Sequence, residues 1–411
     1  MNIKQVLNEE ISNIRPQPDE TRKLENFAKD FISLLNKNKL RAQIGGSLAK
    51  GTMIKKSEKQ DIDIFVIFDF SEDILKLGKI LEKIKLPGKL KKVHGSRDYF
   101  QIECVDTILE IIPVIENKDP ALAENVTDVS LSHVKFVRGE IEKNLELADE
   151  IRLAKAFCRG QGCYGAESYI KGFSGYTLEI LVIYFGSFVN FLKGIPKKKI
   201  IDPKKYFRSD REILRELNSS KLTGPLILID PTYKYRNVAA GLGQETFTKF
   251  LSGVKLFLKS PSLDYFEPKR ISIEELKSIA EKNKAKLVEV NLSTEKQEGD
   301  IAGSKMRKFF DFFTTELSRK QQEILTKDFY YPGKGKLATG FIIIKEKKEI
   351  EIRGPSIGLE KAVENFKKSR REIYRKGKFY YVKENTSIKE IFNSIKKVEK
   401  EMNVEVGIKL I

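Results

Sequence analysis

The chain has 411 residues, 40% of them hydrophobic and 33% charged, and its 76 Lys and Arg exceed its 58 Asp and Glu to give a net charge of +18. This length predicts roughly two to four domains, and the basic excess favours a polyanionic partner, nucleic acid ahead of an anionic membrane, with an ordinary solvated basic surface as the alternative. Three cysteines without a CxxC pair and two histidines argue against a disulfide framework and a Cys/His zinc site, so any metal would be held by carboxylates.

The N-terminal stretch MNIKQVLNEEISNIRPQPDE is polar and acidic and lacks the apolar run of a signal peptide. The longest apolar stretch, LEILVIYFGSFVNFL at 178–192, is interrupted by Glu179 and Asn190 and is too short to span a bilayer. We therefore expect a cytoplasmic protein without a membrane partner.

Residues 1–138 are predicted to form an α+β domain. Helical spacing marks 19–38, and a strand, a Gly-Gly turn, a short helix and a second strand follow through residue 68. Residues 72–85 read as helix, and 99–105 with 107–115 read as a hairpin whose second strand is ended by Pro113.

Residues 139–260 are predicted to be mainly helical. Helices are expected over 143–162 and 175–192, followed by an exposed lysine-rich connection at 194–210. The stretch GPLILIDP at 224–231 reads as a short strand, and 233–260 reads as helix up to a boundary near Ser260-Pro261.

Residues 261–411 are predicted to form an α+β part in which basic helices lie on a sheet. Helix and strand are expected over 271–293, a strong amphipathic helix over 304–324, two strands joined by a charged turn over 337–355, a basic helix over 361–374 and a strand over 376–384. Residues 301–411 carry 26 Lys and Arg against 15 Asp and Glu, which concentrates the basic charge here. This combination is typical of RNA-binding domains.

Three carboxylates lie in apolar strands of the first domain. Because side chains alternate along a strand, Asp61 and Asp63 point the same way while Ile62 and Ile64 face the core, and Glu110 lies in the apolar run TILEIIPVI. Converging carboxylates would be compensated by two bound Mg²⁺, or Mn²⁺, ions. Such a pair activates a hydroxyl and stabilises leaving pyrophosphate in an in-line displacement.

The turn Gly45-Gly46-Ser47 fits the same reaction. Glycines let the backbone approach phosphate oxygens, a helix opening at Ser47 presents amides to an anion, and Lys50 adds a charge one turn later. Either motif alone is most often structural, whereas the two in this order and spacing are much more specific.

Together these motifs resemble the DNA polymerase β nucleotidyltransferase superfamily and, more closely, the archaeal class I CCA-adding enzymes (tRNA nucleotidyltransferases). The resemblance continues through SLSHVKFV, CYGAESYIKGFSGY, IDPTYKYRNVAAGL and SPSLDYFEPK and weakens after about residue 270. It implies a polymerase-β-like head, a helical neck, and an α+β body and tail that grip tRNA. The implied reaction adds C, C and A to the 3′ end of tRNA from CTP and ATP without a template.

The resemblance also implies roles for particular residues. Asp61 and Asp63 correspond to the metal ligands, and Glu110 to a third carboxylate that is usually aspartate in the family. The implied nucleotide-binding residues are Gly46, Ser47 and Lys50 for the triphosphate, His133, Lys155 and Tyr164 for nucleotide contacts, and Asp230 and Arg236 for selecting C or A.

Structural readings of the same residues stay open. His133 could be a satisfied core histidine, Lys155 a solvated helix lysine and Tyr164 a packed aromatic residue, while Asp230 and Arg236 could form an ion pair that closes the neck.

Basic residues of the helix expected over 361–374 are predicted to bind RNA; they are Lys367, Lys368, Arg370 and Arg371. A poly(A) polymerase, another RNA-terminal nucleotidyltransferase or a catalytically inactive RNA-binding relative are the alternatives to CCA addition. The oligomeric state also stays open, with a homodimer among the alternatives.

Overall fold

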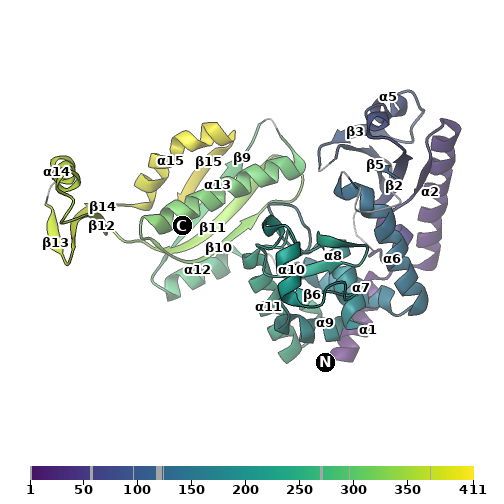
Figure 1. Ribbon diagram of the computed structural model, residues 1–411, viewed down its shortest axis with the longest axis horizontal. Coiled ribbons are helices and arrows are strands. Elements are labelled where there is room, and N and C mark those ends of the chain that lie inside the picture. Colours follow the sequence, from purple (N-terminus) through teal and green to yellow (C-terminus); the bar gives the residue numbers. More distant parts are fainter. Residues whose placement is uncertain are drawn as a thin grey trace. The chain divides into compact units, whose positions relative to one another are not determined.

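The computed structural model describes residues 2–411 apart from 56–58, 96, 117–122, 124, 269–271, 296 and 371. The chain forms two compact units, Met1–Lys269 and Arg270–Ile411 (Figure 1). Both units contain helices and strands, which confirms the predicted α+β multidomain class. The predicted head and neck fall within the first unit, and most of the predicted body and tail falls within the second.

The first unit begins with a helix and a five-stranded sheet in the order β1-β2-β5-β4-β3. The strands β2 (Gln60–Phe68) and β5 (Thr107–Ile115) run parallel, while β1 (Ala42–Ile44), β4 (Tyr99–Glu103) and β3 (Lys89–Val93) join antiparallel. Helix α2 (Pro18–Lys37) covers one face, where its Phe31 and Leu35 share a buried cluster with Ile62 and Ile64. The alternation of β2 therefore leaves Asp61 and Asp63 on the other face, as predicted.

Two local predictions for this sheet need correction. The helix expected over 72–85 is two short helices, α4 (Ser71–Ile74) and α5 (Leu77–Leu81). Pro113 does not end β5, which continues to Ile115. Among the described strands β4 pairs only with residues 108–111 of β5, and beyond them the Pro113 carbonyl accepts from Arg97 Nη1 at 3.3 Å. The backbone N and O of one strand residue face the same edge of the strand, so the missing N–H of Pro113 would point toward the β4 side. Because β4 does not pair with β5 at this position, no hydrogen bond between the strands is lost.

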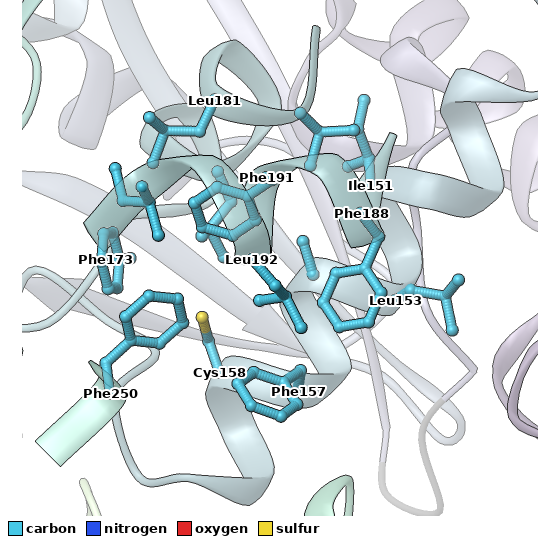
Figure 2. Packing of buried hydrophobic residues seen from close by; sticks show 14 of the residues in the cluster. Ile151, Leu153, Phe157, Cys158, Phe173, Leu181, Phe188, Phe191, Leu192 and Phe250 are labelled. Atoms are coloured by element: carbon cyan, nitrogen blue, oxygen red, sulfur yellow. The ribbon is translucent and has the colours of Figure 1, made fainter. Parts of the chain in front are cut away.

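The rest of the first unit is built around an aromatic core. Helices α7 (Leu147–Gly160) and α8 (Gly175–Phe185) pack against each other, with α1 (Ile3–Ile14), α9 (Phe188–Gly194) and α11 (Gln244–Lys259) around them. Phe157, Phe188, Phe191 and Phe250 are fully buried (Figure 2). The Phe157 ring contacts those of Phe188 and Phe250, and the Phe250 ring also contacts that of Phe191. Burial of each ring contributes roughly 2–3 kcal/mol, so this core fixes how α7 and α8 face each other.

The remaining elements of this unit connect these helices; they are α3 (Gly46–Lys50), η2 (Val126–Val129), α6 (Ser130–Lys143), η3 (Ile195–Lys197), β6 (Ile200–Ile201), α10 (Asp210–Glu216), η4 (Ser219–Lys221), β7 (Ile227–Asp230), β8 (Tyr233–Asn237) and η5 (Leu263–Tyr265). Residues 194–210 are not simply an exposed connection, because Ile195 and Ile201 are buried. The expected helix over 233–260 was wrong in its first part: residues 233–237 are strand β8, which turns back on β7. That hairpin places Arg236 near Asp230.

The second unit contains two antiparallel sheets. The larger has the order β10-β11-β9-β15, and α13 (Gly299–Arg319) packs on it and on α15 (Ile388–Met402), while α12 (Ile273–Lys282) packs on β9 and β11. The smaller has the order β12-β14-β13 and is packed by α14 (Glu360–Ser369). The strands are β9 (Lys286–Ser293), β10 (Glu323–Tyr330), β11 (Leu337–Lys345), β12 (Glu349–Ser356), β13 (Tyr374–Lys376), β14 (Phe379–Asn385) and β15 (Glu405–Leu410). The two strands expected over 337–355 exist, but they belong to different sheets.

Within the described residues, no single helix is long and apolar enough to cross a membrane. Only the pair Gly175–Phe185 and Phe188–Lys197, bent by 91°, has a sufficient combined length and composition. Two of its phenylalanines, Phe188 and Phe191, are buried in the aromatic core of Figure 2.

Candidate active site

The parallel register of β2 and β5 brings three carboxylates to one cavity. Asp61 and Asp63 lie on β2, and Asp63 is paired in register with Glu110 of β5. All three line a cavity of about 220 Å³. The sequence could identify each carboxylate, but the pairing of Asp63 with Glu110 depends on two strands more than forty residues apart.

The donor chemistry of these residues suits a hard divalent cation, because carboxylate oxygens are the ligands that Mg²⁺ and Mn²⁺ prefer. Glu110 is oriented by Gln101 of β4, whose Nε2 donates to its Oε1 at 2.8 Å. In the part of the chain that the structure describes, no group of three or more His, Cys, Asp and Glu side chains is arranged to hold a metal ion. The metal-ligand roles of Asp61, Asp63 and Glu110 therefore stay a prediction.

The Gly45-Gly46-Ser47 turn needs its glycines because it lies against β2. Gly46 has φ +54°, and a Cβ there would lie 1.6 Å from Asp63 Oδ2; a Cβ on Gly45 would lie 2.6 Å from the Phe65 ring. The Gly45 N–H also donates to the Asp63 carbonyl at 2.8 Å. Helix α3 begins at Gly46, and Ser47 lines the cavity. The turn thus supports the Asp63 carboxylate directly.

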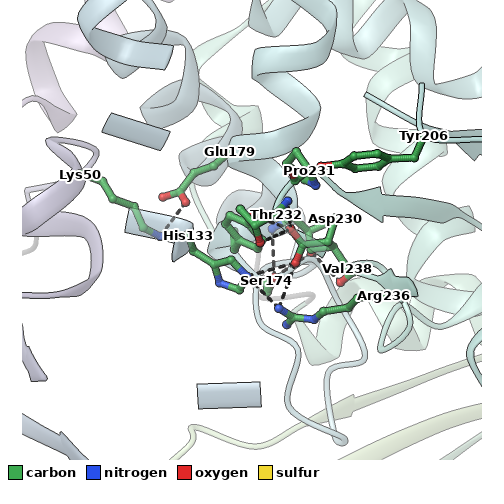
Figure 3. A network of polar contacts seen from close by, with 12 residues as sticks. Lys50, His133, Ser174, Glu179, Tyr206, Asp230, Pro231, Thr232, Arg236 and Val238 are labelled. Carbon is green, nitrogen blue, oxygen red and sulfur yellow. Dashed lines mark hydrogen bonds and ion pairs between the residues drawn. The ribbon is translucent and has the colours of Figure 1, made fainter. Parts of the chain in front are cut away.

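Both lysines predicted to bind the nucleotide, Lys50 and Lys155, meet at Glu179, a residue that the sequence did not assign to the site. Lys50 Nζ lies 2.8 Å from Glu179 Oε2 (Figure 3). Lys155 Nζ lies 2.8 Å from Glu179 Oε1. The Thr52 hydroxyl donates to Glu179 Oε1 at 2.9 Å and accepts from Lys155 Nζ at 2.9 Å. All four residues line the cavity. The available sequence signal was a single carboxylate within the apolar stretch at 178–192.

Glu179 is ionised despite being only 1% exposed. Burial alone would raise the pKa of Glu179, but the charges of Lys155 and Lys50 and their hydrogen bonds outweigh burial and lower it to about 2. Lys155 is itself buried, so it is not a solvated helix lysine. Two cations and one anion leave a net positive charge on this wall of the cavity.

Tyr164 lines the same cavity and is also packed. Its ring centroid lies 4.7 Å from the Arg159 guanidinium carbon, and its backbone forms a bridge with Phe173. Its hydroxyl lies close to Gly175, where an added Cβ would be 3.1 Å from the hydroxyl oxygen. The structure therefore satisfies the packing interpretation while keeping the ring at the cavity wall.

Asp230, His133 and Arg236 meet in a second polar network (Figure 3). Asp230 Oδ2 lies 3.1 Å from His133 Nε2 and 3.2 Å from Arg236 Nη1. Asp230 Oδ1 accepts from the Thr232 backbone N–H at 2.8 Å, the Thr232 hydroxyl at 2.7 Å and the Tyr176 hydroxyl at 3.0 Å. The Asp230–Arg236 ion pair is therefore real, and a role in nucleotide selection stays a prediction beside it.

The electrostatics of this network hold His133 neutral and Asp230 charged. Burial lowers the pKa of His133 to about 4. Burial alone would raise the pKa of Asp230, but the hydrogen bonds from His133 and Thr232 and the charge of Arg236 outweigh burial and lower it to about 2. His133 Nε2 also lies 2.9 Å from Arg236 Nη1. Because a guanidinium only donates, a neutral ring uses Nε2 either to accept from Arg236 or to donate to Asp230.

Tyr176 connects this network to the cavity. Its ring stacks on His133 with centroids 3.7 Å apart, and it lines the cavity. Lys50 Nζ lies 5.5 Å from the Tyr176 centroid. Of the eight predicted nucleotide-binding residues, four line the cavity: Ser47, Lys50, Lys155 and Tyr164. Gly46 precedes Ser47 without lining the cavity, and His133, Asp230 and Arg236 form the neighbouring network that Tyr176 joins.

Three of the predicted RNA-binding residues lie at or directly after the end of α14 in the second unit: Lys367, Lys368 and Arg370. Lys368 pairs with Glu364 at 2.9 Å, Arg370 pairs with Glu384, and Lys367 lies 5.2 Å from the Tyr380 centroid. The predicted contact Arg371 lies outside the described residues. The neighbouring carboxylates offset part of the positive charge, and RNA binding here stays a prediction.

The sequence is similar to known tRNA-processing proteins. Residues 149–267, which include Lys155, Tyr164, Asp230 and Arg236, match the family described as tRNA nucleotidyltransferase, second domain. The chain is 40% identical over 222 residues to the CCA-adding enzyme of Nanoarchaeum equitans, covering 53% of this chain and 55% of that one. It is 33% identical over 295 residues to that of Methanocaldococcus jannaschii (67% and 64%) and 28% identical over 403 residues to that of Thermococcus gammatolerans (92% and 84%). The matched part thus spans between half and two thirds of the length of the first two relatives.

Solved structures support the fold. A cytoplasmic RNA terminal U-transferase superposes with a TM-score of 0.51 at 12% identity, covering 66% of this chain and 99% of the other. The Cid1 poly(U) polymerase does so with a TM-score of 0.51 at 12% identity, covering 64% and 98%. The polymerase-β-like nucleotidyltransferase fold predicted for the head is therefore confirmed.

Proposed function

Since the chain is a relative of the archaeal CCA-adding enzymes, we propose that it adds C, C and A to the 3′ end of tRNA from CTP and ATP without a template and releases pyrophosphate. One observation carries the proposal: a single cavity is lined by Asp61, Asp63 and Glu110 from the sheet and by Lys50 and Lys155 from α3 and α7. Carboxylates and cations that line the same cavity suit a metal-dependent transfer of a nucleotide from a triphosphate.

In this proposal the carboxylates of Asp61, Asp63 and Glu110 would hold two Mg²⁺, or Mn²⁺, ions. When bound, such ions lower the pKa of the attacking 3′-hydroxyl and neutralise the leaving pyrophosphate. Gly46 lies directly against the Asp63 side chain, and Gln101 donates a hydrogen bond to one oxygen of Glu110. Glu110 has the longer side chain at a position where the family usually has aspartate, and its hydrogen bond to Gln101 limits where that longer arm can turn.

The remaining roles follow from charge and hydrogen-bonding capacity. Ser47 and Lys50 would hold the triphosphate, with Lys155 and Tyr164 on the same cavity wall. Arg236 would read the base, because a guanidinium has five donors in a fixed fork and Asp230 orients it through Nη1. His133, held neutral by burial, would support that orientation. Lys367, Lys368, Arg370 and Arg371 would contact the RNA backbone.

The proposal is tested with the full chain, Mg²⁺, labelled CTP and ATP, and three tRNA transcripts that end before CCA, after C and after CC. We expect addition to stop at CCA and A to be added only after CC. Long A tails, or addition of U from UTP, would replace the proposal with another RNA-terminal nucleotidyltransferase. Binding of tRNA without incorporation of any nucleotide would leave an inactive RNA-binding relative.

A cytoplasmic location and a homodimer are further predictions about the same protein. The location rests on the sparse cysteines, which are free at 104, 158 and 163 in the structure. The dimer is tested by the mass in solution with and without tRNA.

A further inference from the structure

The Lys50–Glu179–Lys155 cluster is asymmetric in a way that assigns different tasks to the two lysines. Lys155 Nζ has three protein acceptors: the Thr52 carbonyl at 3.3 Å, the Thr52 hydroxyl at 2.9 Å and Glu179 Oε1 at 2.8 Å. An ammonium group has three donors, so these contacts occupy all of them. Lys50 has Glu179 Oε2 as its ion-pair partner, and its side chain is 11% exposed against 4% for Lys155.

The charges make Glu179 and a triphosphate competitors for Lys50. Glu179 balances only one of the two lysine charges, and a triphosphate entering the cavity brings several more negative charges to the same wall. Lys155 cannot turn to the phosphates without giving up the hydroxyl and carbonyl of Thr52 as well as Glu179. Lys50 gives up one carboxylate oxygen and a 5.5 Å contact with the Tyr176 ring. Lys50 is therefore the cation that exchanges partners.

Resting on the function proposed above, we propose that Glu179 is a positioning residue of the triphosphate site. Glu179 holds Lys50 at the cavity until the triphosphate replaces Glu179 as the ion-pair partner of Lys50. Lys155 and Thr52 hold Glu179 in the same position before and after this exchange. No covalent step is involved, because only ion-pair partners are exchanged. Glu179 lies on α8 and Lys155 on α7, so the aromatic core between these helices keeps the carboxylate at its position.

The test is Glu179→Gln, which keeps the shape and removes the competing charge. We expect the affinity for inorganic tripolyphosphate, measured by calorimetry without RNA, to rise about tenfold, because the wall gains one net positive charge. In turnover assays the KM for CTP should fall, because the variant binds the triphosphate more tightly. The kcat should also fall, because Lys50 is then held less precisely and the tighter binding stabilises the ground state rather than the transition state. A merely structural role would weaken binding instead.

The matched control is Glu150→Gln on α7, a half-buried carboxylate that accepts from the Phe188 backbone N–H at 2.6 Å. It should leave the affinity for tripolyphosphate unchanged. Unchanged or weaker binding by a folded Glu179→Gln variant would overturn the inference, as would wild-type protein that does not bind tripolyphosphate.

A measurement on the wild-type protein covers the case in which Glu179→Gln does not fold. With ¹⁵N-labelled lysine, tripolyphosphate should shift the Nζ signal of Lys50 and leave that of Lys155 in place; the reverse pattern would overturn the inference. Because these readouts need no RNA, a wild-type protein that binds tripolyphosphate as described but adds no nucleotide refutes the proposed function and leaves Glu179 as a positioning residue for a triphosphate.

Discussion

The contact between Gly46 and Asp63 allows a sharp test of the catalytic carboxylates. Gly46→Ala adds one methyl group at a position with φ +54°, where the new Cβ would lie 1.6 Å from Asp63 Oδ2 and 2.4 Å from its Cγ. Gly51→Ala is a matched control. Gly51 follows the C-terminal end of the same short helix with φ +69°, and a Cβ there would meet nothing within 4 Å. Both changes carry the same backbone penalty, and only one touches Asp63.

The magnitudes separate stability from catalysis. A left-handed backbone costs a residue with a Cβ about 1–2 kcal/mol, which both variants should lose from their free energy of unfolding. At Gly46 the carboxylate must also move by roughly 1.7 Å to restore a carbon–oxygen contact of about 3.3 Å. A misplacement of about 1 Å at a reacting centre reduces the rate on the order of 100-fold.

We would measure urea unfolding and single-turnover addition of C to a tRNA transcript for both variants. The expected result is a similar loss of stability in both and a loss of rate of about 100-fold in Gly46→Ala alone. Equal rates in the two variants would refute the argument that Gly46 supports Asp63 in the reaction.

Three further predictions concern charge. Asp61→Ala and Asp63→Ala should each abolish incorporation and leave tRNA affinity nearly unchanged, as measured by turnover and filter binding; retained turnover would contradict the metal assignment. Reversing the charge of Lys367 and Lys368 should weaken tRNA binding and reduce the slope of log K against log salt by about one per lost phosphate contact, whereas an unchanged slope would mean that these lysines face solvent. Glu10 is buried, and burial raises the pKa of Glu10 to about 7, so the folded state holds its proton more tightly than the unfolded state and stability falls as pH rises from 4.5 through 7. Glu10→Gln should therefore be more stable than wild type at pH 8 by about 3 kcal/mol and equal to it at pH 4, and a pH-independent difference in urea unfolding would contradict this.

The amino-acid sequence determined the features that depend on neighbours along the chain. The period of two along β2 sends Ile62 and Ile64 into the core and leaves Asp61 and Asp63 together, whichever strand lies alongside. Helical spacing likewise determined α2, whose observed bounds follow the predicted stretch 19–38. It also located α13, although this helix begins and ends five residues before the predicted stretch 304–324. The motifs also carried the resemblance to CCA-adding enzymes, which the comparisons support.

Local patterns misled where tertiary pairing overrode them. Residues 233–237 read as the start of a helix, but pairing with β7 makes them a strand. Pro113 was predicted to end β5, but the strand continues to Ile115. The missing N–H of Pro113 is tolerated because, in the described part of the sheet, β4 pairs with β5 only at residues 108–111. In both cases a partner distant in sequence decided the backbone conformation.

The tertiary structure alone decided the composition of the site. Glu110 stands beside Asp63 because two strands pair in one register, and a slip by one residue would turn it to the other face. Glu179 joins Lys50 across 129 positions of sequence, and His133 joins Asp230 across 97. Such contacts follow from how the helices and the sheet pack, and a buried charge reveals its partner only when that packing is known.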